Sequence, residues 1–391
     1  MSKRKSGGKT VRKPAPSTAV AVNRPRVVTD ALIRWYRASH RDLPWRADPS
    51  PYHVWLSEIM LQQTRVEAVK GYYERFLRDI PDINTLAYAD EEKLLKLWEG
   101  LGYYSRVRNF QKAARIIVSD HDGVLPSEVA ELKKLPGIGD YTAGAVASIA
   151  YGKRAALVDG NVLRVMARLR EDTRDIALAE TKKAVLSELT SDYLPEKDTD
   201  CGTFNQALME LGAVVCVPNG PPLCNDCPVR AHCLAAQNGT QTSFPVKSAK
   251  KPRRIEHRTV LLLSDRTRIA LRRRPAKGLL AGLYEYPSLD GHLSMQDVRR
   301  VLKQSRIPAL RIKTLPDAKH VFTHIEWLMK GYLVLTETFP DDASRLAAAA
   351  ADKAFPDGLL FADRTDVADV YAIPSAFQAY TAIVRDLLAF I

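Results

Sequence analysis

The 391-residue sequence has no apolar run long enough to span a bilayer, and its N-terminus has no apolar core of the secretory kind. These absences predict an intracellular protein without a membrane partner. The bacterial cytoplasm, at the nucleoid, and the eukaryotic nucleus both fit, and we favour the former. Five cysteines in such a chain are better candidates for metal or redox ligands than for disulfides.

Acidic side chains are missing from residues 1–27, whereas eight lysines and arginines lie there and supply eight of the 13 net positive charges. With two glycines and three prolines, this segment predicts a disordered basic arm. The arm can add non-specific affinity for DNA or act as a solubility tail. Because only five net charges remain for the other residues, a pI of about 9.4 is weak evidence for a polyanionic partner.

Helical patterning covers residues 28–236, with a glycine-rich turn in its middle. Pro136 ends one helical pattern, and Gly137 and Gly139 permit the positive φ and close approach that a tight turn needs before a helix that begins near Asp140. The bare backbone of such a turn can bind a DNA phosphate. An ordinary helix–helix turn that binds nothing is the alternative.

Two carboxylates are candidates for acid–base chemistry. Glu58 lies in a helical run that is apolar on nearly every side, where desolvation would raise its pKa and suit it to act as a general acid. A glutamate at the rim of a helix is the alternative. Asp159 precedes an apolar-periodic segment, which predicts an N-cap that the helix terminus keeps ionised. Cleavage of a glycosidic bond uses such a pair.

Other side chains suit contact with an opened duplex. Gln62 and Gln63 are long and uncharged, so they could fill the gap that an extruded base leaves, although surface glutamines are often idle. Tyr103 lies on a glycine turn near two arginines and could stack on a base or belong to the core. The loop Leu43–Arg46 carries a tryptophan and a guanidinium that could sandwich a flat ring.

Cys216, Cys224, Cys227 and Cys233 follow the spacing C-x7-C-x2-C-x5-C, which indicates a metal centre. The spacing alone fits either an iron–sulfur cluster or a structural zinc ion. Cys201 is left over. Residues 237–256 then form a basic linker, and alternating β-like patterns, with one helix near Met295 to Lys303, predict a separate α/β domain over residues 257–391.

The hairpin, Glu58, Asp159 and the cysteine group together resemble the adenine-DNA glycosylases of the MutY type, in the endonuclease III-like helix-hairpin-helix superfamily. The resemblance runs from about Val28 over nearly the whole chain. It implies an all-α helix-hairpin-helix glycosylase core with an iron–sulfur module, followed by an α/β Nudix-like C-terminal domain. It also implies one 4Fe-4S cluster on the four cysteines. The family's first cysteine gap has six residues, and we interpret the seven here as a loop insertion.

The resemblance further assigns site residues. Glu58 would protonate a flipped adenine and Asp159 would stabilise the sugar cation, with Tyr141 and Asn161 in support. The expected adenine pocket consists of Leu43, Trp45, Arg46 and Gln206. Gln63 and Tyr103 would insert into the duplex.

The same match bears on the type of reaction. In bifunctional relatives, a lysine two residues after the second hairpin glycine attacks the sugar, and Tyr141 stands at that place here. The resemblance therefore implies a monofunctional glycosylase.

The segment Leu280–Pro287 resembles the family's Nudix-like domain, and Phe322, Thr323 and His324 match its loop that reads 8-oxoguanine. The middle residue is often serine in the family, and threonine keeps the hydroxyl. No glutamate-rich magnesium-binding run follows Pro287, so we expect this domain to bind and not to hydrolyse.

The expected activity is removal of adenine mispaired with 8-oxoguanine, and with guanine, from double-stranded DNA by a monomer. A bifunctional glycosylase and lyase acting on oxidised pyrimidines and a non-catalytic iron–sulfur DNA-lesion binder are the alternatives.

Overall fold

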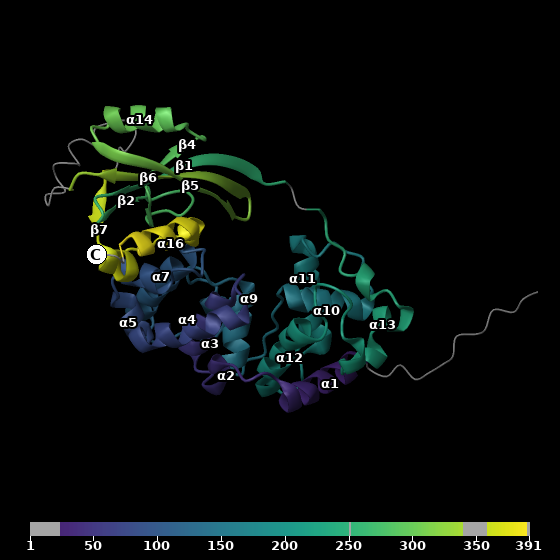
Figure 1. Cartoon of the computed structure of the whole chain (residues 1–391). Helices are drawn as coiled ribbons and strands as arrows, with labels where there is room; N and C mark the ends of the chain where they lie inside the picture. The colour runs from purple at the N-terminus through teal and green to yellow at the C-terminus, as the bar shows by residue number, and fades with distance from the viewer. Residues whose placement is uncertain (1–23, 250–251, 339–357, 389–391) are drawn as a thin grey trace, which may run out of the picture. The chain divides into compact units, whose positions relative to one another are not determined.

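The computed structural model describes residues 24–249, 252–338 and 358–388 (Figure 1). It divides into two compact units, which we call the first unit (the chain up to His40 with Val158–Val246) and the second unit (Arg41–Leu157 with the chain from Lys247 onward). Most of the predicted basic arm, residues 1–23, lies outside the described residues. Its last four residues begin helix α1 (Arg24–Ser39), where Pro25 occupies the first turn, a position that proline favours. None of the helices in these ranges combines the length and apolar composition that a bilayer crossing needs.

The first unit is helical. Helix α12 (Cys201–Val214) packs against α1 and against α10 (Gly160–Arg170), while α11 (Ala179–Glu188) and α13 (Leu234–Asn238) also contact α10. The approach of α12 to α10 requires a glycine, because a Cβ atom at Gly212 would lie 2.5 Å from the Cβ of Asn161. This close packing fixes the start of α10, where Asp159 and Asn161 lie.

The second unit begins with a helical part built around an aromatic core. The rings of Trp55 and Phe110 meet edge-on with centroids 4.3 Å apart, and Phe76 meets Trp98 edge-on at 5.9 Å. The helical patterning predicted over residues 28–236 is confirmed here, with helices that begin at Pro51, Glu91 and Ser105 among others. The helices of this part are α2 (Pro44–Ala47), α3 (Pro51–Leu61), α4 (Val66–Asp79), α5 (Ile83–Tyr88), α6 (Glu91–Leu97), α7 (Ser105–Asp120), α8 (Val129–Leu132) and α9 (Asp140–Ala145).

The predicted hairpin lies between α8 and α9, and α9 begins at Asp140 as expected. Gly137 has the predicted positive φ of +80°, and a Cβ there would lie 2.8 Å from the Cβ of Asn109. Gly139 does not use the positive φ that its lack of a side chain permits: its φ is −97° with extended ψ, and a Cβ would meet no atom within 4 Å. Gly139 is the N-cap residue of α9, a position that needs an extended backbone rather than a left-handed one.

A mixed sheet forms the rest of the second unit, as the alternating sequence patterns predict. Its strands are β1 (Arg254–Ser264), β2 (Ile269–Arg273), β3 (Tyr284–Glu285), β4 (Ser288–Asp290), β5 (Ala309–Val321), β6 (Ile325–Thr336) and β7 (Leu360–Ala362). The main order is β3-β2-β1-β6-β5, in which β1 and β6 are parallel and the other neighbours antiparallel.

A helix covers each face of this sheet (Figure 1). Helix α14 (Met295–Gln304) confirms the predicted helix near Met295, and Ser294 with Asp297 closes a capping box at its start. Val298 and Leu302 of α14 pack on one face of the sheet. Helix α16 (Gln378–Leu387) packs Tyr380 and Val384 on the other.

The sheet part and the helical part of the second unit share apolar contacts. Leu283 precedes β3 and Ala372 follows β7. Both residues lie buried in the aromatic core of the helical part. Polar contacts surround them: Ile373 N donates to Glu99 Oε1 (2.9 Å), and the hydroxyl of Tyr284 donates to Glu92 Oε1 (2.9 Å). The two parts are therefore packed as one unit.

The carboxylate of Glu285 on β3 should be the most sensitive polar group in the sheet. It is fully buried and lies 2.5 Å from a guanidinium nitrogen of both Arg272 and Arg274. In Glu285→Gln two mostly buried guanidinium groups lose their counter-charge, so we expect the free energy of unfolding to fall by about 3–5 kcal/mol.

Urea unfolding monitored by tryptophan fluorescence measures this loss. The matched control is Glu67→Gln, since Glu67 is exposed and pairs with Lys70 on the surface at 2.9 Å. We expect that variant to remain within ~0.5 kcal/mol of the wild type. Equal unfolding midpoints for the two variants would contradict this prediction, because the buried interactions of Glu285 would then stabilise the fold no more than the surface pair does.

Candidate functional site

Glu58 lies in the middle of α3, where only 6% of the residue is exposed. Pro51 and the apolar side chains around Glu58 explain both the start of this helix and its burial. The hydroxyl of Tyr141, in the first turn of α9, donates a short hydrogen bond to Glu58 Oε2. The hairpin helix therefore holds the carboxyl group of Glu58 in one orientation, a contact that the sequence did not reveal.

Asp159 is the N-cap of α10, as predicted. Its Oδ1 accepts a hydrogen bond from the backbone N–H of Val162 (2.7 Å), and its Oδ2 accepts one from Asn161 Nδ2 (2.9 Å). The surroundings of this cap also affect its acidity. Burial raises the pKa of Asp159, and the hydrogen bonds from Val162 and Asn161 oppose this effect without overcoming it.

Arg164 is a functional candidate that the sequence analysis missed. Its side chain is buried one helical turn after Gly160 and donates to Asn161 Oδ1 (2.8 Å) and to the carbonyl oxygen of Gly212 (2.7 Å). Its Nε donates to the carbonyl oxygen of Cys216 (2.8 Å). The arginine thus orients Asn161, which in turn orients Asp159. The sequence feature that could have identified Arg164 is a basic residue within the apolar helical pattern that follows Asp159.

The four spaced cysteines lie near one another at the end of the first unit. Burial, together with the nearby thiols of Cys216, Cys233 and Cys224, raises the pKa of Cys227 to about 12. The seven-residue gap after Cys216 closes with a hydrogen bond from Leu223 N to Val215 O (2.9 Å). The longer loop therefore leaves Cys216 beside the other cysteines.

An arginine one turn beyond Arg164 also contacts this cysteine group. Arg168 Nη1 donates to Cys216 Sγ (3.3 Å) and to the carbonyl oxygen of Val217 (2.9 Å), and the thiol of Cys233 lies 3.4 Å from the carbonyl oxygen of Arg168. Of these contacts, the donation to Cys216 Sγ is of the kind that surrounds a metal-bound thiolate. Within the described part of the chain, no three His, Cys, Asp or Glu side chains converge on a point that would suit a single metal ion.

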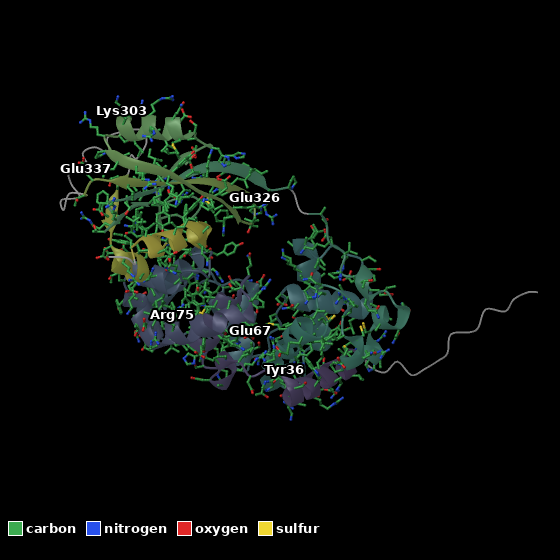
Figure 2. The ribbon with its side chains drawn as sticks, viewed as in Figure 1. Tyr36, Glu67, Arg75, Lys303, Glu326 and Glu337 are labelled. Carbon is green, nitrogen blue, oxygen red and sulfur yellow. The ribbon has the colours of Figure 1, made fainter. Side chains whose placement is uncertain are left out.

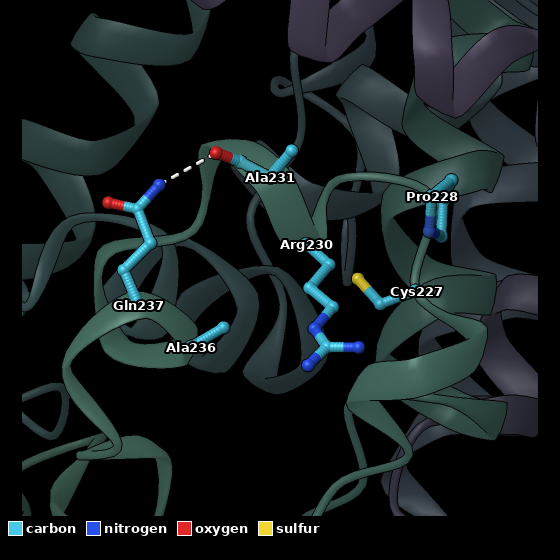
Figure 3. A pocket seen from close by; sticks show the side chains of 6 residues that line it. All are labelled: Cys227, Pro228, Arg230, Ala231, Ala236 and Gln237. Atoms are coloured by element: carbon cyan, nitrogen blue, oxygen red, sulfur yellow. Dashed lines mark hydrogen bonds between the residues drawn. The ribbon is translucent and has the colours of Figure 1, made fainter.

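A hollow lies beside Cys227 (Figure 3). Gln237 Nε2 donates to the carbonyl oxygen of Ala231 (2.6 Å) across one side of it. Its lining consists of Cys227, Pro228, Arg230, Ala231, Ala236 and Gln237. Since Cys227 is part of this lining, the hollow belongs to the cysteine site.

The residues expected to insert into a duplex lie on two turns of the second unit. Gln63 follows α3 and Tyr103 precedes α7, and the side chains of both are exposed. Both have a positive φ, 59° and 46°, which is uncommon for residues other than glycine. Gln62, beside Gln63, is only partly exposed.

The expected lesion-reading residues form the turn between β5 and β6. Phe322 packs its ring edge-on against Trp327 (4.9 Å between centroids), and its N–H donates to Ile325 O (2.8 Å), which leaves Thr323 and His324 exposed at the tip. The hydroxyl groups of Thr323 and Tyr103 lie 2.5 Å apart. The structure therefore places a predicted inserting residue beside this predicted turn.

The four expected pocket residues are divided between the units. Leu43 and Trp45 lie in the core of the second unit, where Trp45 meets Tyr73 edge-on at 5.5 Å, and Arg46 Nη1 donates to the carbonyl oxygen of Arg41 (2.8 Å). Gln206 belongs to the first unit. Its Oε1 accepts a hydrogen bond from the hydroxyl of Tyr36 (2.9 Å), which is labelled in Figure 2.

Two family models match the chain. Residues 56–191 match the model described as "HhH-GPD superfamily base excision DNA repair protein", and residues 258–382 match the NUDIX domain model. The first match lies largely on the helical part and the second on the sheet part. The predicted fold class, a helix-hairpin-helix glycosylase core followed by a Nudix-like α/β domain, is confirmed.

Curated relatives cover most of the chain. The sequence is 35% identical over 365 residues to the adenine DNA glycosylase of Homo sapiens, a match that covers 77% of this chain and 66% of that protein. It is 32% identical over 304 residues to the adenine DNA glycosylase of Buchnera aphidicola subsp. Baizongia pistaciae (strain Bp), covering 76% of this chain and 83% of that protein. The chain thus spans about two thirds of the human relative's length.

A solved structure is also similar to part of the chain. A thermostable thymine-DNA glycosylase is 28% identical with a TM-score of 0.49, and the match covers 55% of this chain and 97% of that one.

The hydrogen bond from Asn161 to Asp159 yields a prediction about acidity. Since the amide of Asn161 favours the ionised carboxylate, Asn161→Ala should raise the pKa of Asp159 above the already raised value of the wild type. Titration of the carboxyl carbon in protein labelled with ¹³C at aspartate measures the difference between the two proteins.

Asn238→Ala is the matched control in the same unit. Asn238 Nδ2 donates to Glu171 Oε2 at the surface (2.9 Å), so its loss should leave the Asp159 titration unchanged. An Asp159 pKa that stays the same or falls in Asn161→Ala would contradict this role of the amide.

Proposed function

This chain belongs to the adenine DNA glycosylase family, and from that premise we propose that it hydrolyses the N-glycosidic bond of adenine mispaired with 8-oxoguanine in duplex DNA. Guanine is the second opposing base that we propose. The hydrogen bond from Tyr141 to the buried carboxyl group of Glu58 is the observation that carries the proposal. It fixes an acid in a poorly hydrated place, as proton transfer to a bound base requires.

Two carboxyl groups divide the chemistry. Glu58 gives a proton to a ring nitrogen of the extruded adenine, so that the bond to the sugar breaks with its electron pair on the base. The sugar is left with oxocarbenium character, which the carboxylate of Asp159 stabilises while water adds. The products are free adenine and an abasic site. Asn161 supports the ionised form of Asp159 that this step needs.

Tyr141 supports a monofunctional reaction. A glycosylase that also cleaves the strand forms a covalent imine between a lysine and the sugar. The phenol of Tyr141 cannot form an imine, and its hydroxyl already donates to Glu58. With water as the acceptor, the strand stays intact.

Recognition of the opposing base is assigned to the exposed tip of the β5–β6 turn. The hydroxyl of Thr323 can donate to or accept from the edge of an 8-oxoguanine base, as serine would. Tyr103 lies beside it and, with Gln63, would fill the space that the extruded adenine leaves. These two insertions would hold the duplex open while the adenine is cleaved.

The four cysteines fit one 4Fe-4S cluster, the group that the family resemblance implies. Such a cluster takes one thiolate at each iron, and the donor set of Cys216, Cys224, Cys227 and Cys233 supplies four. Arg168 already donates to Cys216 Sγ and would keep doing so in the loaded protein. Bound there, the cluster would hold the loop that follows α12 and, through Cys216 O and Arg164, the start of α10.

Glu58→Gln should abolish the proposed activity. Glutamine keeps the shape of the side chain but has no acidic proton to transfer, so the single-turnover rate of adenine excision opposite 8-oxoguanine should fall by at least about 10²-fold. Glu67→Gln, an exposed glutamate on α4, should leave the rate unchanged. Near-wild-type excision by Glu58→Gln would contradict the mechanism.

In the same assay, the wild type should cleave adenine faster opposite 8-oxoguanine than opposite guanine, and slowest opposite thymine.

The bifunctional alternative makes a different chemical prediction. Borohydride reduces an imine between a lysine and the sugar to a permanent protein–DNA adduct. With Tyr141 at the position in question, we expect no adduct above the level that abasic DNA gives with an unrelated basic protein. A strong adduct with DNA containing an oxidised pyrimidine would favour the alternative. Tight binding without any abasic product would favour a non-catalytic lesion binder.

A further inference from the structure

Arg106 has more hydrogen bonds to the backbone than its place near the start of α7 would require. Only 9% of the residue is exposed. Its Nη1 donates to the carbonyl oxygens of Ile59 (2.7 Å), Met60 (3.1 Å) and Gln62 (2.7 Å). Its Nη2 donates to those of Leu101 (2.8 Å) and Gly102 (3.0 Å). One buried guanidinium therefore joins the end of α3 to the turn before α7.

The bonded carbonyls have a particular place in the chain. Gln62 O belongs to the peptide group that precedes Gln63, and Gly102 O belongs to the one that precedes Tyr103. Gln63 and Tyr103 are two of the described non-glycine residues with positive φ. A left-handed conformation costs free energy in such residues and persists only when the surroundings enforce it. Arg106 donates to the peptide group that precedes each of these two residues.

The tyrosine is held from a second direction. Trp98 Nε1 also donates to Gly102 O (3.2 Å), and the guanidinium of Arg106 lies 5.4 Å from the Trp98 ring centre and 5.8 Å from that of Tyr103. Burial lowers the pKa of Arg106 to about 10, so the side chain stays charged at neutral pH. A lysine would offer one point of donation where the planar guanidinium offers a fork.

We propose that Arg106 is a positioning residue that clamps the two turns, so that Gln63 and Tyr103 present their side chains to the duplex as one preformed wedge. The inference rests on the proposed function, since it assigns Arg106 to the extrusion step of that reaction. Extrusion of a base leaves a gap that side chains must fill, and side chains fixed beforehand lose less conformational entropy on insertion. Arg106 acts through the backbone and touches neither base nor sugar.

The test measures extrusion apart from cleavage. In a Glu58→Gln background, 2-aminopurine replaces adenine opposite 8-oxoguanine, and its fluorescence rises when it leaves the base stack. At DNA concentrations that saturate binding, adding Arg106→Lys should lower the extrusion equilibrium about tenfold. Arg115→Lys is the matched control, because Arg115 lies on the same helix and donates to a single carbonyl, that of Ala87 (2.9 Å). It should leave the fluorescence unchanged.

Double variants test whether Arg106 acts through the wedge. With Gln63→Ala and Tyr103→Ala both present, Arg106→Lys should have no further effect on extrusion. Trp98→Phe removes one donor to Gly102 O, and it is the substitute variant for this test if Arg106→Lys does not fold. Its effect on extrusion should vanish with Tyr103→Ala and persist with Gln63→Ala. An additive effect of Arg106→Lys on the double alanine variant, or of Trp98→Phe on Tyr103→Ala, would overturn the clamp.

The outcomes separate the clamp from the proposed function. If the wild type excises adenine and the probe is extruded, but Arg106→Lys matches Arg115→Lys, only the clamp is overturned. If the wild type neither excises adenine nor extrudes the probe, the proposed function fails and the clamp falls with it.

Discussion

The hydrogen bond from a buried arginine to a backbone carbonyl is the interaction on which the sites of this protein depend. A carbonyl at the end of a helix or in a turn has no partner within its own element and must find one elsewhere. Arg106 serves five such carbonyls, and Arg164 and Arg168 serve those around Cys216. Because the guanidinium is flat and carries five donors, one side chain can fix several segments at once.

The same pattern connects the proposed catalytic groups to the fold. Asp159 is held by Asn161, Asn161 by Arg164, and Arg164 by carbonyls at Gly212 and Cys216. On the other unit, Tyr141 of the hairpin helix holds Glu58. The orientation of each proposed catalytic carboxyl group thus depends on a hydrogen bond from a side chain of its own unit.

Much of the fold could be predicted because its signals are local. The helix limits, the cap at Asp159 and the alternating strands follow from residues within one or two turns of each other. The roles of Arg106 and Arg164 could not be found in this way, since their partners lie up to 52 residues away and depend on tertiary packing. The cap at Asp159 is local, but the burial that raises the pKa of its carboxyl group depends on tertiary packing. Gly139 shows that composition alone does not fix φ.

The burial of Leu283 and Ala372 in the aromatic core of the helical part has a consequence for evolution and engineering. A domain that only tethers a reading loop could be exchanged or removed at its linker. Here the sheet part, which carries the β5–β6 turn, also supplies side chains to the core of the helical part. A chain without the sheet part would therefore expose an apolar patch to water where those side chains now lie. The same domain therefore carries the proposed reading turn and the side chains that complete the core of the helical part, so grafting a different domain would require residues that fill the places of Leu283 and Ala372.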